Sequence, residues 1–442
     1  MNESVAPLAP STGNEASPAF VQAVAELSAR RPVTTSQPIY NQQGIKLLEG
    51  GVAIGQSLYQ KLVSHRLSLP LDECIDPGPG VDAAALEAAA RAAVARWPFF
   101  GRVAPAGASG RALLDAVAAI RLPKPVALHL TLARETRPAL FDHSVLMALL
   151  CGHLVRESGA TGAAVRDAAA AGLLHDLGML HIESGLLDTE DRLSGDELRP
   201  LYVHPLTSSM LVDRFAEYSK EIVRAVVEHH ERLDGSGYPR GLAGDAMSPL
   251  GRVLALAEVV TAMFDGERRL PEQRLSLLLR INPRRYDPAH VATVHRLLDV
   301  AAEAGELEGV GAEALVARLL QLIDVLALWR DSSAAIRRDL DAERAALIGS
   351  IDAQNATLQR MLYDAGVTRE QLAALADDIA AEGALRIELW TLAEELLWQL
   401  HAAANQLTRR WRGAGADVAH PPALAAWFAA VAALDVERSP AR

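Results

Sequence analysis

The chain has 442 residues, enough for two or three domains, and half of them are apolar, so it can bury a sizeable core. Its formal net charge of −12 excludes a general binding surface for nucleic acid or for an anionic membrane, because no basic field exists that could release counterions. An anionic substrate must therefore be held by metal ions and a few local arginines.

Cysteine content and segment composition indicate a cytoplasmic protein. The two cysteines, Cys74 and Cys151, show no CxxC spacing, which excludes a disulfide framework and a thiolate zinc site. Residues 1–18 are rich in Ser, Pro and Ala; we expect them to be disordered and find no signal-peptide pattern there. The longest uncharged apolar stretch, 423–434, is shorter than the roughly 18 residues that a membrane span requires.

Residues 19–120 predict a small N-terminal α+β module. A short helix is expected at 21–31, where a proline follows, and a hairpin at 39–48, where Asn and Gly occupy the turn. The alanine-rich segment 83–96 predicts a further helix. Residues 101–110 are rich in Gly, Pro and Ala, which is typical of a linker.

Residues 121–328 contain a series of apolar helical patterns, each of which delivers a histidine or a carboxylate. These patterns cover residues 141–157, 166–174, 221–231 and 252–263. Another helix is expected to begin at the capping box formed by Ser194 and Glu197 and to run toward His204. The segment is therefore predicted to be a helical bundle whose successive helices each carry a polar side chain.

The polar positions of this bundle predict a metal site. Six of them, on four segments, are His143, His175, Asp176, His204, His229 and His230, and Glu258 lies on a fifth. The successive separations 143 to 175, 175 to 204 and 204 to 229 each match one helix plus a connection, so the positions can converge on one point. A lone histidine in an apolar helix is more often an ordinary core residue. Imidazole and carboxylate on four segments instead favour divalent transition metals, which a carboxylate can bridge.

The run 229–239 reads His-His-Glu-Arg-Leu-Asp-Gly-Ser-Gly-Tyr-Pro. Its two histidines end a predicted helix, and Gly235, Gly237 and Pro239 then require a tight loop that is incompatible with a helix. Together with Phe-Asp-His-Ser at 141–144 and His-Asp-Leu-Gly at 175–178, this run makes residues 133–330 resemble the HD-GYP domains, a family of metal-dependent cyclic-di-GMP phosphodiesterases.

The resemblance implies a mainly α protein. We expect an HD-type helical bundle with the small N-terminal α+β module before it and a C-terminal helical hairpin after it. The implied metal ligands are His143, His175, Asp176, His204, His229 and His230, with Asp176 bridging two ions. The implied cofactors are two divalent transition-metal ions, iron or manganese, although the ligand chemistry also allows zinc, nickel or cobalt.

The implied reaction is hydrolysis of cyclic-di-GMP by water or hydroxide that bridges the two ions. His175, Asp176 and Asp234 are the expected catalytic residues. The loop residues expected to contact substrate are Gly235, Gly237, Tyr238 and Pro239. Arg268 and Arg269 follow where the family often has basic residues that meet the dinucleotide, but a pair of arginines in a loop is as often plain surface charge.

Several positions depart from the family pattern. Met179 replaces the usual lysine after the His-Asp pair and so removes a cation near the phosphate. Glu258 and Thr261 replace two aspartates, and only Glu258 can still ligate a metal. Ala139 stands where members with three metals have a glutamate, so we expect two metals at most.

These departures keep two other functions open. The chain can be a catalytically weak or inactive HD-GYP module that senses cyclic-di-GMP or binds a protein partner. It can also be a hydrolase of another phosphoester, because HD-type sites act on several nucleotides.

Residues 329–442 carry two leucine stripes with steps of seven, four and three residues. The first contains Leu340, Leu347, Ile351, Leu358 and Leu362, and the second contains Leu385, Leu389, Leu392, Leu396 and Leu400. They predict two helices separated near 366–369. The helices can form an antiparallel hairpin within one chain, or a surface for a homodimer or another protein partner.

Overall fold

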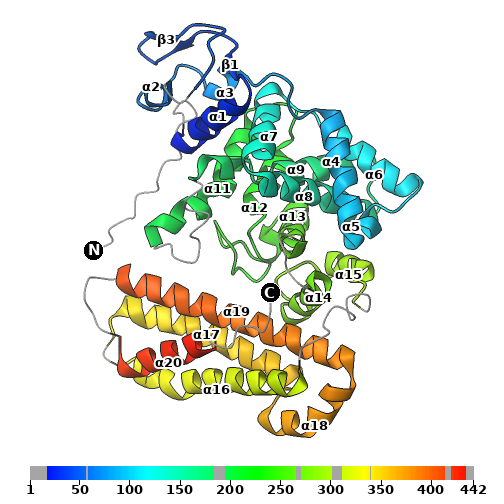
Figure 1. Ribbon diagram of the computed structural model, residues 1–442, viewed down its shortest axis with the longest axis vertical. Coiled ribbons are helices and arrows are strands. Elements are labelled where there is room, and N and C mark those ends of the chain that lie inside the picture. Colours follow the sequence, from blue (N-terminus) through cyan, green and yellow to red (C-terminus); the bar gives the residue numbers. More distant parts are fainter. Residues whose placement is uncertain are drawn as a thin grey trace. The chain divides into compact units, whose positions relative to one another are not determined.

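The computed structural model describes residues 17–55, 58–183, 195–264, 270–300, 311–338, 340–413 and 420–434. Helices dominate these residues and only four short strands occur among them, which confirms the mainly α prediction (Figure 1). The chain divides into two compact units. The first consists of Met1–Asp188, Arg199–Arg268 and Asn282–Leu298, and the second of Thr189–Leu198, Arg269–Ile281 and Asp299–Arg442.

The N-terminal part of the first unit contains short strands between helices. Its elements are α1 (Pro18–Arg30), β1 (Thr34–Thr35), β2 (Ile39–Tyr40), β3 (Lys46–Leu48), α2 (Tyr59–Val63), α3 (Leu71–Cys74) and β4 (Ile75–Asp76). β2 and β3 form the predicted antiparallel hairpin, and β1 pairs with β4. Asn41 closes the hairpin turn because its Oδ1 accepts hydrogen bonds from the amides of Gln43 and Ile45.

The predicted linker at 101–110 is wrong. After α4 (Ala83–Arg96), two more helices, α5 (Pro98–Val103) and α6 (Ala108–Ala118), occupy most of this segment. A Cβ atom at Gly110 would lie 2.0 Å from the carbonyl oxygen of Pro105, so this glycine permits close packing of the backbone rather than flexibility.

The helical bundle of the first unit, which includes α11 (Gly195–Asp213) from Arg199 onward, carries the predicted polar positions. Its elements are α7 (Lys124–Thr136), α8 (Pro138–Glu157), α9 (Ala163–Leu174), η2 (Leu177–His181), α11, α12 (Lys220–Glu228), η4 (Gly244–Ala246), α13 (Pro249–Thr261), η5 (Ala262–Phe264) and α15 (Pro288–Leu297). α8 packs along α9, and α13 packs on both α8 and α12 (Figure 1). Ser194 of the predicted capping box lies outside the described residues.

α8 is the central helix of this bundle. By length and composition it could cross a membrane, but 72% of its apolar window is buried inside the protein. A Cβ atom at Gly172 of α9 would lie 2.6 Å from the backbone oxygen of Met147, so the two helices approach closely there. This close packing explains why α8 is apolar on nearly all sides.

The second unit is a helical bundle with its own core. It contains α14 (Pro271–Ile281), α16 (Ala312–Ile336), α17 (Ala342–Asp364), α18 (Arg369–Ala381), α19 (Gly383–Gly413) and α20 (Pro422–Ala433). Apart from Leu340, which precedes α17, the predicted leucine stripes lie on α17 and α19, and most of their residues are buried in a core shared with α16 and α20. The two helices are not joined by a short turn near 366–369 as predicted, because α18 lies between them in the sequence. They are part of a larger bundle, since two helices alone would leave these leucines only partly covered.

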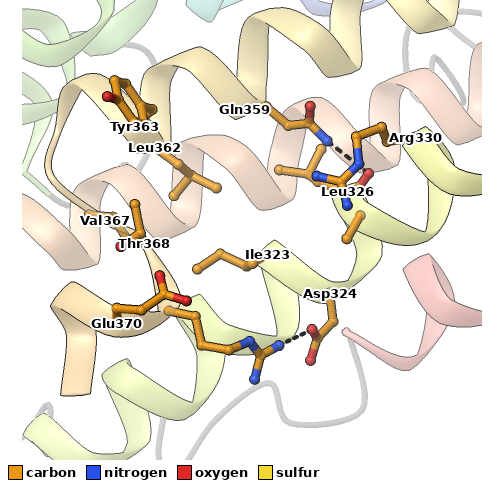
Figure 2. Close-up of a pocket in the computed structure, with 12 residues that line it drawn as sticks. Ile323, Asp324, Leu326, Arg330, Gln359, Leu362, Tyr363, Val367, Thr368 and Glu370 are labelled. Atoms are coloured by element: carbon orange, nitrogen blue, oxygen red, sulfur yellow. Dashed lines mark hydrogen bonds and ion pairs between the residues drawn. The ribbon is translucent and has the colours of Figure 1, made fainter.

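A cavity of about 430 Å³ opens between α16, α17 and α18 of this unit (Figure 2). Ile323, Leu326 and Leu362 contribute apolar lining, and Arg369 pairs with Asp324 at its rim. The side-chain amide of Gln359 on α17 donates a hydrogen bond to the backbone oxygen of Leu326 on α16, 3.0 Å away. Polar contacts therefore hold these helices together around the opening.

Candidate metal centre

Five helical segments deliver the predicted ligands to one place. His143 lies in the second turn of α8, His175 and Asp176 directly follow α9, and His204 lies in the middle of α11. The other three are His229 and His230, which directly follow α12, and Glu258, in the last turn of α13. The ligand atoms form three groups, each spanning no more than 4.8 Å. They are His143, His175 and Glu258; His175, Asp176 and His229; and His204, His229 and His230.

Asp176 lies between the two ends of this cluster. Its Oδ2 is 3.3 Å from Nε2 of His175, whereas its Oδ1 is 3.1 Å from Nε2 of His204 and 3.5 Å from Nε2 of His229. One carboxylate oxygen thus faces each half of the cluster, as a bridging ligand requires.

Glu258 supplies the second carboxylate. Its Oε2 lies 3.1 Å from Nε2 of His143 and 3.3 Å from Nε2 of His175, and these two nitrogens are 3.3 Å apart. The longer side chain of glutamate therefore reaches the same two histidines that define one half of the cluster.

The histidine tautomers fit a metal site. Nδ1 of His175 lies 2.7 Å from the backbone oxygen of Gly172, and Nδ1 of His229 lies 2.6 Å from that of Val226. Nδ1 of His204 makes the same contact with the oxygen of Leu201. A carbonyl oxygen only accepts, so each Nδ1 carries a proton and Nε2 is the ring nitrogen that faces the cluster.

The Nε2 atoms that face the cluster lie close to one another. The Nε2 atoms of His204 and His229 are only 3.1 Å apart, and in neutral rings neither carries a proton to share. Lone pairs and carboxylate oxygens at such distances repel unless a cation lies among them. The donor set of imidazole nitrogen and carboxylate oxygen suits divalent transition metals.

The charge states in the cluster agree with this arrangement. Burial alone would raise the pKa of Asp176, but His175 and His204 hold it well below its usual range. Burial would also raise the pKa of Glu258, but His143 and His175 hold it well below its usual range. Burial lowers the pKa of His229 and of His230. Asp176 and Glu258 overcome burial and raise the pKa of His175 to about 9, so its Nε2 carries a proton at neutral pH that a metal ion would have to displace. Both carboxylates are thus ionised, as ligands must be.

Glu231 holds the loop that follows the paired histidines. This side chain is fully buried, and its two carboxylate oxygens accept hydrogen bonds from the amides of Arg240 (2.7 Å) and Leu242 (2.8 Å). A Cβ atom at Gly237 would lie 2.4 Å from the Cα of Glu231, so only glycine permits this close approach. The sequence analysis assigned no role to Glu231. Its position directly after the paired histidines, inside the motif, could have indicated a role for this carboxylate.

The same loop places Tyr238 over the cluster. The Tyr238 ring stacks on that of His230 with centroids 4.6 Å apart, and its amide donates to the backbone oxygen of His230. Burial raises the pKa of Tyr238, so its hydroxyl stays protonated. Gly235 has a φ of +78°, which an L side chain rarely adopts, and lies where Asp234 bridges to Ala243.

Asp234, which was predicted to be catalytic, contacts other groups. Asp234 belongs to none of the three ligand groups: its Oδ1 accepts from the amide of Ser236 and its Oδ2 lies 3.5 Å from Nε of Arg285, so it stabilises the loop turn. Arg268 and Arg269 lie outside the described residues.

The positions that depart from the family pattern are occupied by residues with other contacts. The backbone oxygen of Met179 accepts a hydrogen bond from Nη1 of Arg137 at 2.6 Å, and its side chain is half-buried. Thr261 is fully buried, and its hydroxyl donates to the backbone oxygen of Ala257. Thr261 therefore supports helix α13 and is absent from the ligand groups.

Residues 128–290 match the HD domain family. A cyclic di-GMP phosphodiesterase of Pseudomonas aeruginosa is 32% identical over 152 residues, which are 34% of this chain and 37% of that protein. A 3'3'-cGAMP-specific phosphodiesterase of Vibrio cholerae is 36% identical over 123 residues, 28% of each protein. The chain thus spans about a third of the length of these relatives.

The solved structure of a HDG"Y"P protein from Bdellovibrio bacteriovorus is also similar. It is 16% identical, with a TM-score of 0.35, and the match covers 60% of this chain and 94% of that one. The family assignment rests on the sequence matches and on the motifs gathered at the cluster. Residues 128–290 thus form an HD domain, and the HD and GYP motifs within them are those of the HD-GYP domains, apart from the departures at Met179, Glu258 and Thr261.

Proposed function

We propose that the chain is a metal-dependent phosphohydrolase that cleaves a phosphodiester bond of cyclic-di-GMP. The observation that carries this proposal is the position of Asp176, which presents one oxygen to each half of a cluster of inward-facing imidazole nitrogens. The relatives are a cyclic di-GMP phosphodiesterase and a 3'3'-cGAMP-specific phosphodiesterase, which supports a cyclic dinucleotide as the substrate class.

The proposed cofactors are two divalent transition-metal ions, iron or manganese. His143, His175 and Glu258 would hold one of them, and His204, His229 and His230 the other, with Asp176 shared. When bound, such a pair supplies a water nucleophile of lowered pKa and stabilises the charge that develops on the phosphate.

The charges of the protein ligands favour an anionic substrate. Only Asp176 and Glu258 among the seven ligands are anionic, so two divalent ions (+4) and two carboxylates (−2) leave a local charge of about +2. This local charge matches the two negative charges of a cyclic dinucleotide, even though the chain as a whole carries −12. The protein can therefore attract its substrate at the cluster without a basic surface.

The loop around Tyr238 would orient the substrate. Glu231 fixes this loop by accepting hydrogen bonds from two of its backbone amides. The glycines at 235 and 237 allow backbone atoms to approach a ligand closely. A wall held in place before binding reduces the entropy lost when the scissile bond is aligned with its nucleophile.

Metal content and product formation together test the proposal. Elemental analysis of the wild type should find about two transition-metal ions per chain, and Asp176→Ala should lose both because each half depends on this carboxylate. Asp234→Ala is the matched control and should retain its metal. Equal metal content in the wild type and Asp176→Ala would refute the proposed site independently of activity.

A sensor without turnover is the second candidate, and Met179 is the observation that favours it. No lysine follows the His-Asp pair, so one cation near the phosphate is missing. Chromatography of cyclic-di-GMP and its linear product, with manganese or ferrous iron supplied, separates the two functions. Tight binding without product from the metal-loaded wild type would establish the sensor.

A further inference from the structure

An aromatic ladder leads from the metal cluster to the protein surface. The ring of His230 lies against that of His204 with centroids 5.0 Å apart, and Tyr238 stacks on His230 at 4.6 Å and 22°. Tyr202 from α11 then meets Tyr238 with centroids 4.8 Å apart at an angle of 88°. Each ring contacts the next, so the ladder begins on a metal ligand and ends on Tyr202.

Tyr202 is exposed although it belongs to this ladder. Its side chain is 46% exposed, and among the described Phe, Tyr and Trp side chains of the first unit only Tyr40, at 38%, is exposed to a comparable extent. Tyr238, by contrast, has one face covered by His230 and is half-buried. A large ring left open beside a catalytic cluster is typical of a ligand-binding surface.

The perpendicular packing of the two tyrosines creates an aromatic corner. A flat ring can stack on the open face of Tyr202 while its edge meets the neighbouring ring, and both geometries are favourable for aromatic pairs. In a cyclic dinucleotide each phosphate is flanked by two nucleosides, so a phosphate at the cluster brings a purine base to the adjoining wall.

We propose that Tyr202 is a substrate-binding residue whose ring stacks on a guanine base of the dinucleotide. This assignment rests on the proposed function, because it requires a phosphate of the same molecule at the metal cluster. Stacking on an aromatic ring depends on the π-face and not on the hydroxyl, so phenylalanine would replace Tyr202 and alanine would not.

Binding measurements on the metal-loaded, full-length protein test this role. Tyr202→Ala should weaken the binding of cyclic-di-GMP, and raise KM if turnover is observed, by roughly tenfold. Tyr202→Phe should stay within about twofold of the wild type, because it keeps the stacking face. Tyr40→Ala, which removes the other exposed tyrosine of this unit, should bind as the wild type does.

Inorganic phosphate serves as the probe without a base. It contacts the metals but not a nucleobase platform, so Tyr202→Ala should bind phosphate and retain metal as the wild type does. A cyclic dinucleotide carrying 2-aminopurine gives a second readout, because stacking quenches its fluorescence. At saturation the quenching should persist in Tyr202→Phe and decrease in Tyr202→Ala.

The outcomes distinguish the two proposals. If the wild type binds cyclic-di-GMP and Tyr202→Ala binds it equally well, the role of Tyr202 is refuted while the proposed function stands. If Tyr202→Ala loses metal or phosphate binding to the same extent as it loses cyclic-di-GMP binding, Tyr202 only supports the fold of the cluster and the assignment is again overturned. A metal-loaded wild type that neither binds nor cleaves cyclic-di-GMP would refute both.

Discussion

Replacing Glu231 by glutamine changes one buried carboxylate and leaves the shape of the side chain intact. The carboxylate accepts from two backbone amides, those of Arg240 and Leu242. Glutamine has one acceptor oxygen, so one amide keeps its partner while the other faces an NH₂ group. An unpaired buried N–H costs about 1–3 kcal/mol, and we expect a loss of about 2 kcal/mol in the local stability of the loop.

Hydrogen exchange over residues 238–242 measures this loss directly. A decrease of about 2 kcal/mol corresponds to roughly 30-fold less protection, and turnover should fall because Tyr238 is less firmly held, while metal content stays unchanged. Glu228→Gln is the matched control: this glutamate is equally buried, but it accepts from Ser248 and Arg224 instead of the loop. Unchanged protection in Glu231→Gln, or the same loss in both variants, would refute the role assigned to Glu231.

Three further predictions concern catalysis, pH and assembly. Met179→Lys should raise turnover of cyclic-di-GMP, on the order of a hundredfold if the new ammonium reaches the phosphate; an unchanged rate by chromatography would show that no cation is missing there. Burial, with His129 adding to it, lowers the pKa of His181 to about 3, so this ring is neutral when folded and the unfolded chain takes up the proton below about pH 6.5. Its contribution to stability is therefore complete above that pH and is lost as the pH falls. Between pH 7.5 and pH 5, the free energy of unfolding measured with a chemical denaturant should decrease by up to about 2 kcal/mol more in the wild type than in His181→Gln. Equal decreases in the two proteins would contradict this. Leu396→Ala, a fully buried change in the second unit, should lower the free energy of unfolding by about 2–5 kcal/mol with unchanged mass by light scattering; a reduced mass with unchanged stability would indicate a dimer seam instead.

The convergence of the candidate ligand positions could be predicted from the sequence because local and global signals agree there. Each histidine follows or interrupts an apolar helix, and helices of that length return the chain to the same region of a bundle. Glu258 was identified in the same way, since a carboxylate between apolar neighbours on a core helix is costly unless it has a cationic partner. In the structure it contacts His143 and His175.

Features that depend on the path of a loop could not be predicted. The bonds from Glu231 to Arg240 and Leu242 arise only after the chain turns at the two glycines. The exposure of Tyr202 likewise depends on where the neighbouring rings are placed, and spacing along α11 gives no information about that. Composition was misleading at Gly110, which permits a close backbone approach inside a helix although its neighbours are typical of a linker.

Thr261, where the family pattern has an aspartate, affects the two halves of the proposed metal centre differently. Because this residue bonds to the backbone of its own helix, α13 contributes one carboxylate, Glu258, and that carboxylate faces only His143 and His175. One half therefore has two histidines and two carboxylates, counting Asp176, whereas the other has three histidines and one carboxylate. Oxygen ligands favour harder cations and imidazole favours borderline ones, so the sequence of α13 makes the two halves chemically unequal and places the greater negative charge beside His143.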